Sequence, residues 1–328
     1  MTTNDNRIPV TIITGFLGAG KTTLLNNIIR KHPERRFAII ENEMGEIGID
    51  GGLIVGADNN IFELSNGCIC CSLNGDFVET MATLLKQEHE FDHLLIETTG
   101  IADPNAVVQS FLAEEFMQKR FRIDCVLCLV DATHVGKLID SEAEVRKQLS
   151  ISELVFINKT EGFSADYLSA LQDRIEEINP TAQIYRVSQA DVSEVNVLDT
   201  YSFSGANIEK TTLSFRNIVP LKQGIRHDIQ AIGISIPDSF SFNKFGYWIE
   251  SFLFFNSKNV FRVKGIISLE DNPRKQILQA VSSIYTIEEG ADWEDSPRFC
   301  KLVFIGRNLV REDLEWALYR LKSGMASL

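Results

Sequence analysis

Three cysteines crowd into one short stretch of this sequence. Cys68, Cys70 and Cys71 lie within "NGCICCS", 66–72, and they are half of the six cysteines in the chain. Thiolates at this spacing suit Zn²⁺ and other soft or borderline metal ions, and three of them leave one position of a tetrahedral site open. An open position suits a metal ion that must leave the site again.

Three other roles suit this stretch less well. Cysteines that act as small buried hydrophobic residues are usually isolated, not crowded into a glycine-flanked loop. A disulfide between the adjacent Cys70 and Cys71 would form a strained ring, and stable disulfides are rare in the cytosol. A redox motif usually shows CxxC at a helix start, which this spacing does not reproduce. Metal binding is therefore the favoured interpretation.

A second stretch, "TGFLGAGKTT" at 14–23, fits the phosphate-loop pattern GxxxxGK[ST]. A β-branched run precedes it and an amphipathic segment follows it. Its glycines allow backbone N–H groups to surround phosphate oxygens. The pattern predicts that Lys21 reaches the β- and γ-phosphates and that Thr22 binds Mg²⁺. The predicted nucleotide contacts in this loop are Gly15, Gly18, Ala19, Gly20, Lys21, Thr22 and Thr23.

The motif "HLLIETTG" supplies the acidic residue that a phosphate loop needs for Mg²⁺. Glu97 ends a buried apolar run, and we expect the N–H of Gly100 to contact a γ-phosphate. Lys21, Thr22 and Glu97 are therefore the catalytic candidates.

The motif "ELVFINKTE" ends in Asn158, Lys159 and Glu161, close to the NKxD pattern of GTPases. An acid at the last position accepts hydrogen bonds from two guanine donors that adenine lacks, so we expect GTP. Glu161 is one methylene longer than Asp, which leaves full guanine selectivity open.

The segment "ENEMGEIGID", 41–50, lies between the phosphate loop and the thiols. Its carboxylates Glu41, Glu43 and Glu46 are further candidates as metal ligands, although ordinary solvation explains such a loop equally well. Its position also suits a switch that rearranges when γ-phosphate is present.

The remaining cysteines serve as controls. Cys125 and Cys128 lie three apart in an expected strand, so their side chains point to opposite faces and cannot share a metal ion. We expect both, and Cys300, to be core residues. The five histidines are scattered and form no HxH or HxxxH pair.

The elements that position these motifs follow from the hydrophobic pattern. From about 8 to 187, apolar β-branched runs alternate with amphipathic segments at 21–31, 76–88 and 103–116, where Asp103 is the expected N-cap. This alternation is typical of a mostly parallel sheet with helices on both faces.

The alternation stops near residue 190. We predict a nucleotide-binding domain at 1–190, a polar connector at 191–228, and a smaller α+β domain with a mainly antiparallel sheet at 229–328. In that last domain a helix is expected at 242–255, one strand at 275–286, and a closing helix at 312–321.

The charge and hydropathy of the chain argue against two classes of binding partner. The formal net charge is -13, so we expect neither nucleic acid nor membrane partners. The polar start leads directly into a strand, and no apolar run approaches the ~20 residues of a membrane span. We expect a cytoplasmic protein.

Taken in order, "GFLGAGKTT", "ENEMGEIGID", "NGCICC", "ETTG" and "NKTE" resemble the CobW-type family of P-loop GTPases, which act as metal chaperones or insertases. "RVKGII" and "KLVFIGRNL" are similar to that family's C-terminal domain. The resemblance implies GTP hydrolysis with Mg²⁺, a metal held by the CxCC thiols, and delivery to a client protein. The chain departs from the family at Glu161, where Asp is usual. It also lacks the His-rich linker of some members, which implies a single metal site.

These features predict a GTP-hydrolysing metallochaperone for a client metalloprotein. Zn²⁺ is the expected metal and Co²⁺ the alternative, since the family includes zinc-, cobalt- and iron-linked members. Two other functions stay open: a nucleotide-binding metal sensor without productive turnover, and a P-loop small-molecule kinase. For the kinase we identify neither an acceptor pocket nor an arginine-rich lid. The sequence leaves the client and the oligomeric state open.

Overall fold

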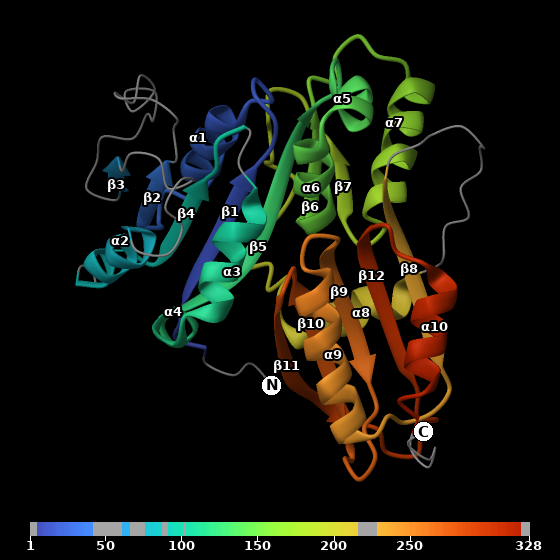
Figure 1. Cartoon of the computed structure of the whole chain (residues 1–328). Coiled ribbons are helices and arrows are strands. Elements are labelled where there is room, and N and C mark those ends of the chain that lie inside the picture. The colour runs from blue at the N-terminus through green and yellow to red at the C-terminus, as the bar shows by residue number, and fades with distance from the viewer. Residues whose placement is uncertain are drawn as a thin grey trace. The chain divides into compact units, whose positions relative to one another are not determined.

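The computed structural model describes residues 5–41, 61–65, 76–86, 91–100, 103–215 and 228–322. The chain divides into two compact units (Figure 1). Unit 1 comprises Met1–Asp173 with Ala182–Ser202, and unit 2 comprises Arg174–Thr181 with Phe203–Leu328. Within the described ranges, no helix is long and apolar enough to cross a bilayer.

Unit 1 is built on a parallel sheet, which confirms the predicted fold class. Its seven described strands lie in the order β3-β2-β4-β1-β5-β6-β7, and every neighbouring pair is parallel. The strands are β1 (Ile8–Thr14), β2 (Phe37–Glu41), β3 (Ile61–Ser65), β4 (His93–Glu97), β5 (Phe121–Asp131), β6 (Leu154–Asn158) and β7 (Gln183–Arg186). All carboxyl ends of parallel strands share one edge, where ligands of such folds bind.

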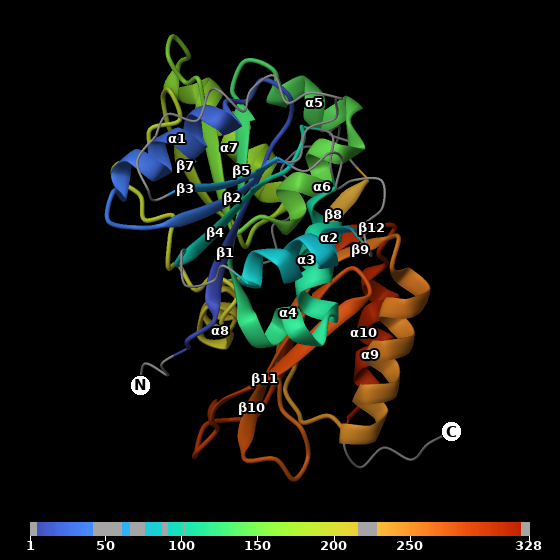
Figure 2. The ribbon, with the colours of Figure 1, turned by 90° about the vertical axis from the view of Figure 1, so that its left-hand side faces the viewer.

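Helices cover both faces of this sheet (Figure 2). The helices that begin in unit 1 are α1 (Lys21–Lys31), α2 (Asp76–Leu84), α3 (Pro104–Ala113), α4 (Glu115–Arg120), α5 (Val135–Ser141), α6 (Ala143–Ile151) and α7 (Ala165–Ile178), and the last residues of α7, from Arg174, are counted in unit 2. Leu24, Leu25 and Ile28 of α1 pack in one core with apolar residues of β1, β2, β4 and β5. On the opposite face, Phe111 of α3 makes an edge-to-face contact with Phe121 of β5, with ring centroids 5.6 Å apart.

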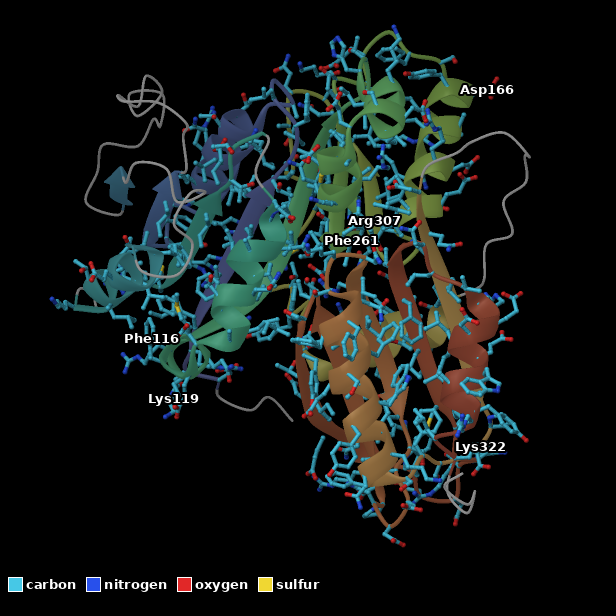
Figure 3. The ribbon with its side chains drawn as sticks, in the orientation of Figure 1. Phe116, Lys119, Asp166, Phe261, Arg307 and Lys322 are labelled. Atoms are coloured by element: carbon cyan, nitrogen blue, oxygen red, sulfur yellow. The ribbon has the colours of Figure 1, made fainter. Side chains whose placement is uncertain are left out.

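Two predicted helices differ in extent. Asp103 caps α3 as expected, because its carboxylate accepts a hydrogen bond from the Asn105 N–H at 3.0 Å. However, α3 ends at Ala113 because Glu114 has an extended backbone, and the separate helix α4 contains Phe116 and Lys119 (Figure 3). The helix expected at 76–88 ends as an α-helix at Leu84.

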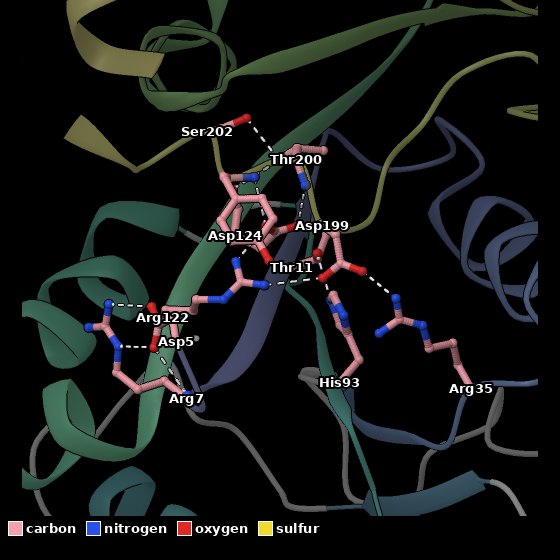
Figure 4. A network of polar contacts seen from close by, with 11 residues as sticks. Asp5, Arg7, Thr11, Arg35, His93, Arg122, Asp124, Asp199, Thr200 and Ser202 are labelled. Carbon is pink, nitrogen blue, oxygen red and sulfur yellow. Dashed lines mark hydrogen bonds and ion pairs between the residues drawn. The ribbon is translucent and has the colours of Figure 1, made fainter. Parts of the chain in front are cut away.

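The last residues of unit 1 are fixed to the start of β5 by a polar network (Figure 4). Asp124 is fully buried and accepts hydrogen bonds from the backbone N–H groups of Thr200 and Tyr201, at 3.0 and 2.9 Å. Arg122 pairs with Asp124 at 2.8 Å and with Asp199 at 3.1 Å. The chain is therefore held in place immediately before it enters unit 2.

Unit 2 contains an antiparallel sheet in the order β11-β10-β9-β12-β8, confirming the predicted α+β class of this part. The strands are β8 (Ile229–Ile236), β9 (Val260–Ile267), β10 (Arg274–Val281), β11 (Ile284–Asp292) and β12 (Cys300–Arg307). The single strand predicted at 275–286 is wrong: Ser282, at φ 53°, turns the chain into a β10–β11 hairpin.

Three further helices pack on this sheet. They are α8 (Gly205–Ser214), α9 (Phe242–Asn256) and α10 (Arg311–Tyr319). Helices α9 and α10 share one hydrophobic core with the sheet, while Ile208 of α8 joins a separate cluster with Ile266, Ile277 and Trp293. The segment predicted as a connector, 191–228, thus contains a packed helix. The exact domain boundaries stay a prediction.

Candidate functional site

The loop between β1 and α1 has the backbone conformation that a phosphate loop needs. Gly15, Gly18 and Gly20 have φ of 140°, 74° and 103°. A Cβ on Gly15 would lie 2.1 Å from the Leu129 carbonyl oxygen, so no other residue fits there. Gly20 is the left-handed N-cap of α1, whose first-turn N–H groups form a natural site for anionic oxygens.

Lys21 begins α1 and is largely buried. Burial lowers the pKa of its ammonium group, and the negative charge of Glu97 opposes that shift. The sheet brings the two residues together because β1 and β4 pair with Ile13 opposite Glu97. Thr22 and Thr23 follow Lys21 in the first turn of the same helix.

Gly100 lies directly against the phosphate loop. A Cβ at this position would come within 2.5 Å of the Leu17 backbone nitrogen. Gln148 of α6 donates a hydrogen bond from Nε2 to the Gly100 carbonyl at 3.1 Å. Thr98 donates its backbone N–H to the Ile13 carbonyl at 2.9 Å. The segment after β4 is therefore tied to both β1 and α6.

The loop after β6 is tied to the phosphate loop by two side chains. Asn158 donates from Nδ2 to the Ala19 carbonyl at 2.9 Å, and Lys159 donates from Nζ to the Gly18 carbonyl at 2.8 Å. Lys159 has φ of 59°, a left-handed conformation. Glu161 lies exposed two residues farther along, where its carboxylate is free to meet a ligand from solvent.

The sequence patterns did not predict two parts of this site, the residue Asp131 and the loop after β7. Asp131, at the end of β5, receives Lys159 Nζ at 2.9 Å. Burial would raise the pKa of Asp131, but hydrogen bonds from Lys159, the Thr133 N–H and His134 outweigh it and lower the pKa to about 2. The sequence pattern could have identified Asp131 as a site residue, because Asp131 ends a predicted strand and the carboxyl ends of parallel strands share one sheet edge.

The second contributor is the loop after β7. Ala190, fully buried with φ of 53°, donates its N–H to Asn158 Oδ1 at 2.8 Å. Asn27 of α1 donates from Nδ2 to the carbonyls of Gln189 and Ala190 at 3.0 and 2.9 Å. Asn158 therefore joins three loops at the carboxyl edge: the phosphate loop, its own loop and this one.

A cavity of about 270 Å³ opens between the phosphate loop and α5. Its walls are mainly apolar, with Phe16, Leu17 and Val135 among them, and Asp131 and His134 form its polar edge. A mainly apolar lining of this kind suits an apolar group better than a phosphate.

The predicted thiol ligands Cys68, Cys70 and Cys71 lie outside the described residues, as do Glu43 and Glu46. Glu41 ends β2, where its backbone pairs with Glu97 on one side and with Ser65 of β3 on the other. Within the described part of the chain, no cluster of three or more His, Cys, Asp or Glu residues could hold a metal ion.

The control cysteines are core residues, as predicted. Cys125, Cys128 and Cys300 are free and fully buried. Burial raises the pKa of all three thiols, to about 12 for Cys128 and Cys300, so they are poor metal ligands at neutral pH.

Comparison with known proteins gives a consistent result across both units. Residues 9–186 match the CobW/HypB/UreG nucleotide-binding domain, and residues 229–322 match the cobalamin synthesis protein CobW C-terminal domain. The chain is 30% identical over 321 residues to the zinc chaperone YjiA of Escherichia coli, covering 97% of this chain and 99% of that protein.

Two further comparisons agree with these matches. The zinc-regulated GTPase metalloprotein activator 1 of Schizosaccharomyces pombe is 28% identical over 349 residues, covering 93% of this chain and 83% of that protein. The crystal structure of the Zn(II)-bound YjiA GTPase from E. coli superposes with a TM-score of 0.73 at 27% identity, covering 97% of this chain and 100% of that one.

Proposed function

The chain belongs to the CobW/HypB/UreG family, and on that premise we propose that it is a GTPase that binds Zn²⁺ and delivers it to a client protein in the cytoplasm. The names of two relatives support this function, since one is a zinc chaperone and the other a zinc-regulated GTPase metalloprotein activator. Co²⁺ is the alternative cargo.

The surroundings of Lys21 support the nucleotide part of the proposal. A triphosphate would compensate the buried ammonium group, whose pKa is lowered by desolvation. The N–H groups of Gly18, Ala19 and Gly20 would surround the phosphate oxygens, while Thr22 and Glu97 would hold Mg²⁺. When bound, Mg²⁺ neutralises charge on the β- and γ-phosphates. Gly100 would sense the γ-phosphate.

Guanine recognition rests on the loop after β6. The hydrogen bonds of Asn158 and Lys159 hold this loop beside the phosphate loop, so a base bound here would lie close to its phosphates. Glu161 would accept the two guanine donors. Adenine presents an acceptor at that position, so GTP is the nucleotide that this loop favours.

The register at the sheet edge is the observation that carries the proposed link between nucleotide and metal. Ser65, Glu41 and Glu97 form one row across β3, β2 and β4. Adjacent strands lie ~4.8 Å apart, so Ser65 and Glu97 are about 10 Å apart at the backbone. Cys68 follows Ser65 by three residues, which span at most ~11 Å of chain. The backbone of Cys68 is therefore within about 21 Å of the backbone of Glu97.

Cys68, Cys70 and Cys71 would bind the cargo metal as thiolates, with one coordination position left for the client's ligand. Glu41, Glu43 and Glu46 belong to the segment between the two sites. In this proposal they contribute carboxylate ligands or rearrange with the γ-phosphate.

Steady-state GTP turnover, measured as phosphate release by metal-free and zinc-loaded protein, tests this function. We expect saturable turnover in both forms, at different rates, and zinc release to a chelator during turnover. GTP binding without turnover in either form would contradict the GTPase and leave the metal sensor.

A further inference from the structure

Helix α9 is apolar on two opposite sides. Its inner side buries Phe245, Ile249 and Leu253 in the core of unit 2. Its outer side presents Tyr247, Phe254 and Phe255, which are 76%, 72% and 80% exposed. A helix on the surface of a globular domain normally has one apolar side, and a helix that is apolar all round is normally buried.

The three exposed rings form one stripe, here called the outer stripe. Phe254 and Phe255 follow Tyr247 by seven and eight residues, close to two helical turns, so the three side chains lie on one side of α9. The rings of Phe254 and Phe255 contact each other edge to face, with centroids 5.3 Å apart. Ser251 lies exposed between them and Tyr247.

The outer stripe has little charge, in a chain whose formal net charge is -13. The charged residues of α9 are Lys244, three residues before Tyr247 on the same side of the helix, and Glu250. Glu250 is exposed three residues after Tyr247 and four before Phe254, so it lies at the edge of the stripe, and its carboxylate accepts a hydrogen bond from the Tyr285 hydroxyl of β11 at 3.2 Å. On α9, two copies of this acidic chain would therefore bring together one carboxylate each, already hydrogen-bonded to Tyr285 of its own chain.

The area of the outer stripe fits a symmetric pair. An aromatic side chain offers ~150–250 Å². At the exposures given, the three rings present roughly 340–570 Å² per chain, or about 700–1,100 Å² for two copies. A specific interface needs about 1,000 Å² in total, which the flanking Ser251 and Lys258 would complete.

We propose that the outer stripe of α9 is a self-association surface, on which a second copy of this chain docks through its own α9 about a two-fold axis. The contact is isologous, because the same three rings lie on both sides. This inference is independent of GTP hydrolysis and of metal binding.

Sedimentation velocity of the full chain, from low micromolar to sub-millimolar concentration and with a chelator present, tests the proposal. We expect a concentration-dependent species of twice the 36.9 kDa chain mass. Tyr247→Ser, Phe254→Ser and Phe255→Ser should each raise the dimer dissociation constant ~10-fold or more, as the loss of a buried aromatic contact does.

Phe242→Ser is the matched control, since Phe242 is 66% exposed on the same helix. It precedes Tyr247 by five residues, about 140° around the helix, and so lies off the stripe. It should leave the dissociation constant unchanged, and thermal unfolding should confirm that every variant is folded. A chain that stays monomeric throughout would overturn the proposal, as would a dimer that the stripe variants leave intact or that Phe242→Ser weakens equally.

Discussion

Glu97 of β4 and Glu41 of β2 lie opposite each other in a parallel register. The strand that ends at the proposed Mg²⁺ ligand is therefore the hydrogen-bonded neighbour of the strand that leads into the acidic segment 41–50. Backbone hydrogen bonds set this register, so we expect a shift at one strand end to displace the other. We propose this relationship as the physical basis for coupling between nucleotide and metal.

Lys21→Ala should abolish GTP hydrolysis and weaken triphosphate binding roughly 10–150-fold, the cost of a lost charge-assisted contact of about 1.5–3 kcal/mol. Because burial already lowers the pKa of Lys21, removing the ammonium group should not lower the free energy of unfolding. Phosphate release and thermal unfolding measure the two effects. Lys137→Ala, at an exposed position of α5, is the control. Unchanged turnover in folded Lys21→Ala would rule out the assigned phosphate site.

Glu161→Ala should lose most of the preference for GTP over ATP. Two guanine donors left without an acceptor cost about 1–3 kcal/mol, or roughly 5–150-fold in affinity. Competition binding with both nucleotides measures the ratio. Glu161→Asp should retain the preference, because it keeps the carboxylate. Equal affinities of the unmutated protein for GTP and ATP would show that Glu161 does not select guanine.

One Zn²⁺ or Co²⁺ should bind per chain through Cys68, Cys70 and Cys71, with release of protons as thiolates form. Bound Co²⁺ should show intense sulfur-to-metal charge-transfer absorption. Replacing the three cysteines by Ser should remove that absorption, while Cys300→Ala should keep it, because Cys300 is buried with its thiol pKa raised to about 12. An unchanged band in the triple variant would exclude these thiols as ligands.

Stability should fall in mild acid because of His93. This side chain is fully buried and shares a hydrogen bond of 2.9 Å with Thr11, between Nε2 and Oγ1. Burial lowers the pKa of His93 from 6.5 to about 3. Between these two pH values the unfolded chain binds a proton that the folded chain does not, so the free energy of unfolding decreases as pH falls.

The expected loss from His93 is about 2 kcal/mol between pH 7 and pH 5, at 1.36 kcal/mol per unit of pKa difference. Denaturant unfolding at both pH values measures it. The double variant Thr11→Val with His93→Leu, which removes both hydrogen-bonding groups, should show a loss smaller by that amount. The same pH dependence in both proteins would assign it to other groups.

The sequence patterns predicted the helices and strands that have a long or regular apolar pattern. They missed the breaks and turns that depend on the backbone conformation of a single residue. Helix α1 coincides with its prediction, and the apolar runs of β1, β4, β5 and β6 were clear. The break at Glu114 and the turn at Ser282 contain no Gly, Pro or Asn to mark them. Strand β3 reads "IFELS", in which Glu63 interrupts the apolar residues, whereas β4 and β6, also five residues long, each contain a continuous apolar run.

The residues of the candidate site were likewise predicted only where a local motif contains them. Lys21, Glu97 and Asn158 were found because each lies in a local motif with its own spacing. Asp131 and Ala190 were missed because their roles arise where distant strand ends meet: Asp131 holds Lys159, and Ala190 holds Asn158. Single-sequence patterns do not record such tertiary contacts.

Zinc affinity, measured by competition with a chelator in the nucleotide-free, GDP-bound and non-hydrolysable GTP-analogue states, tests the coupling most directly. We expect the three affinities to differ by roughly 5–150-fold, the range of typical coupling free energies. Zinc should change the affinity for the GTP analogue by the same factor, since coupling is reciprocal. Three identical zinc affinities would mean two independent sites and would contradict nucleotide-controlled delivery of the metal.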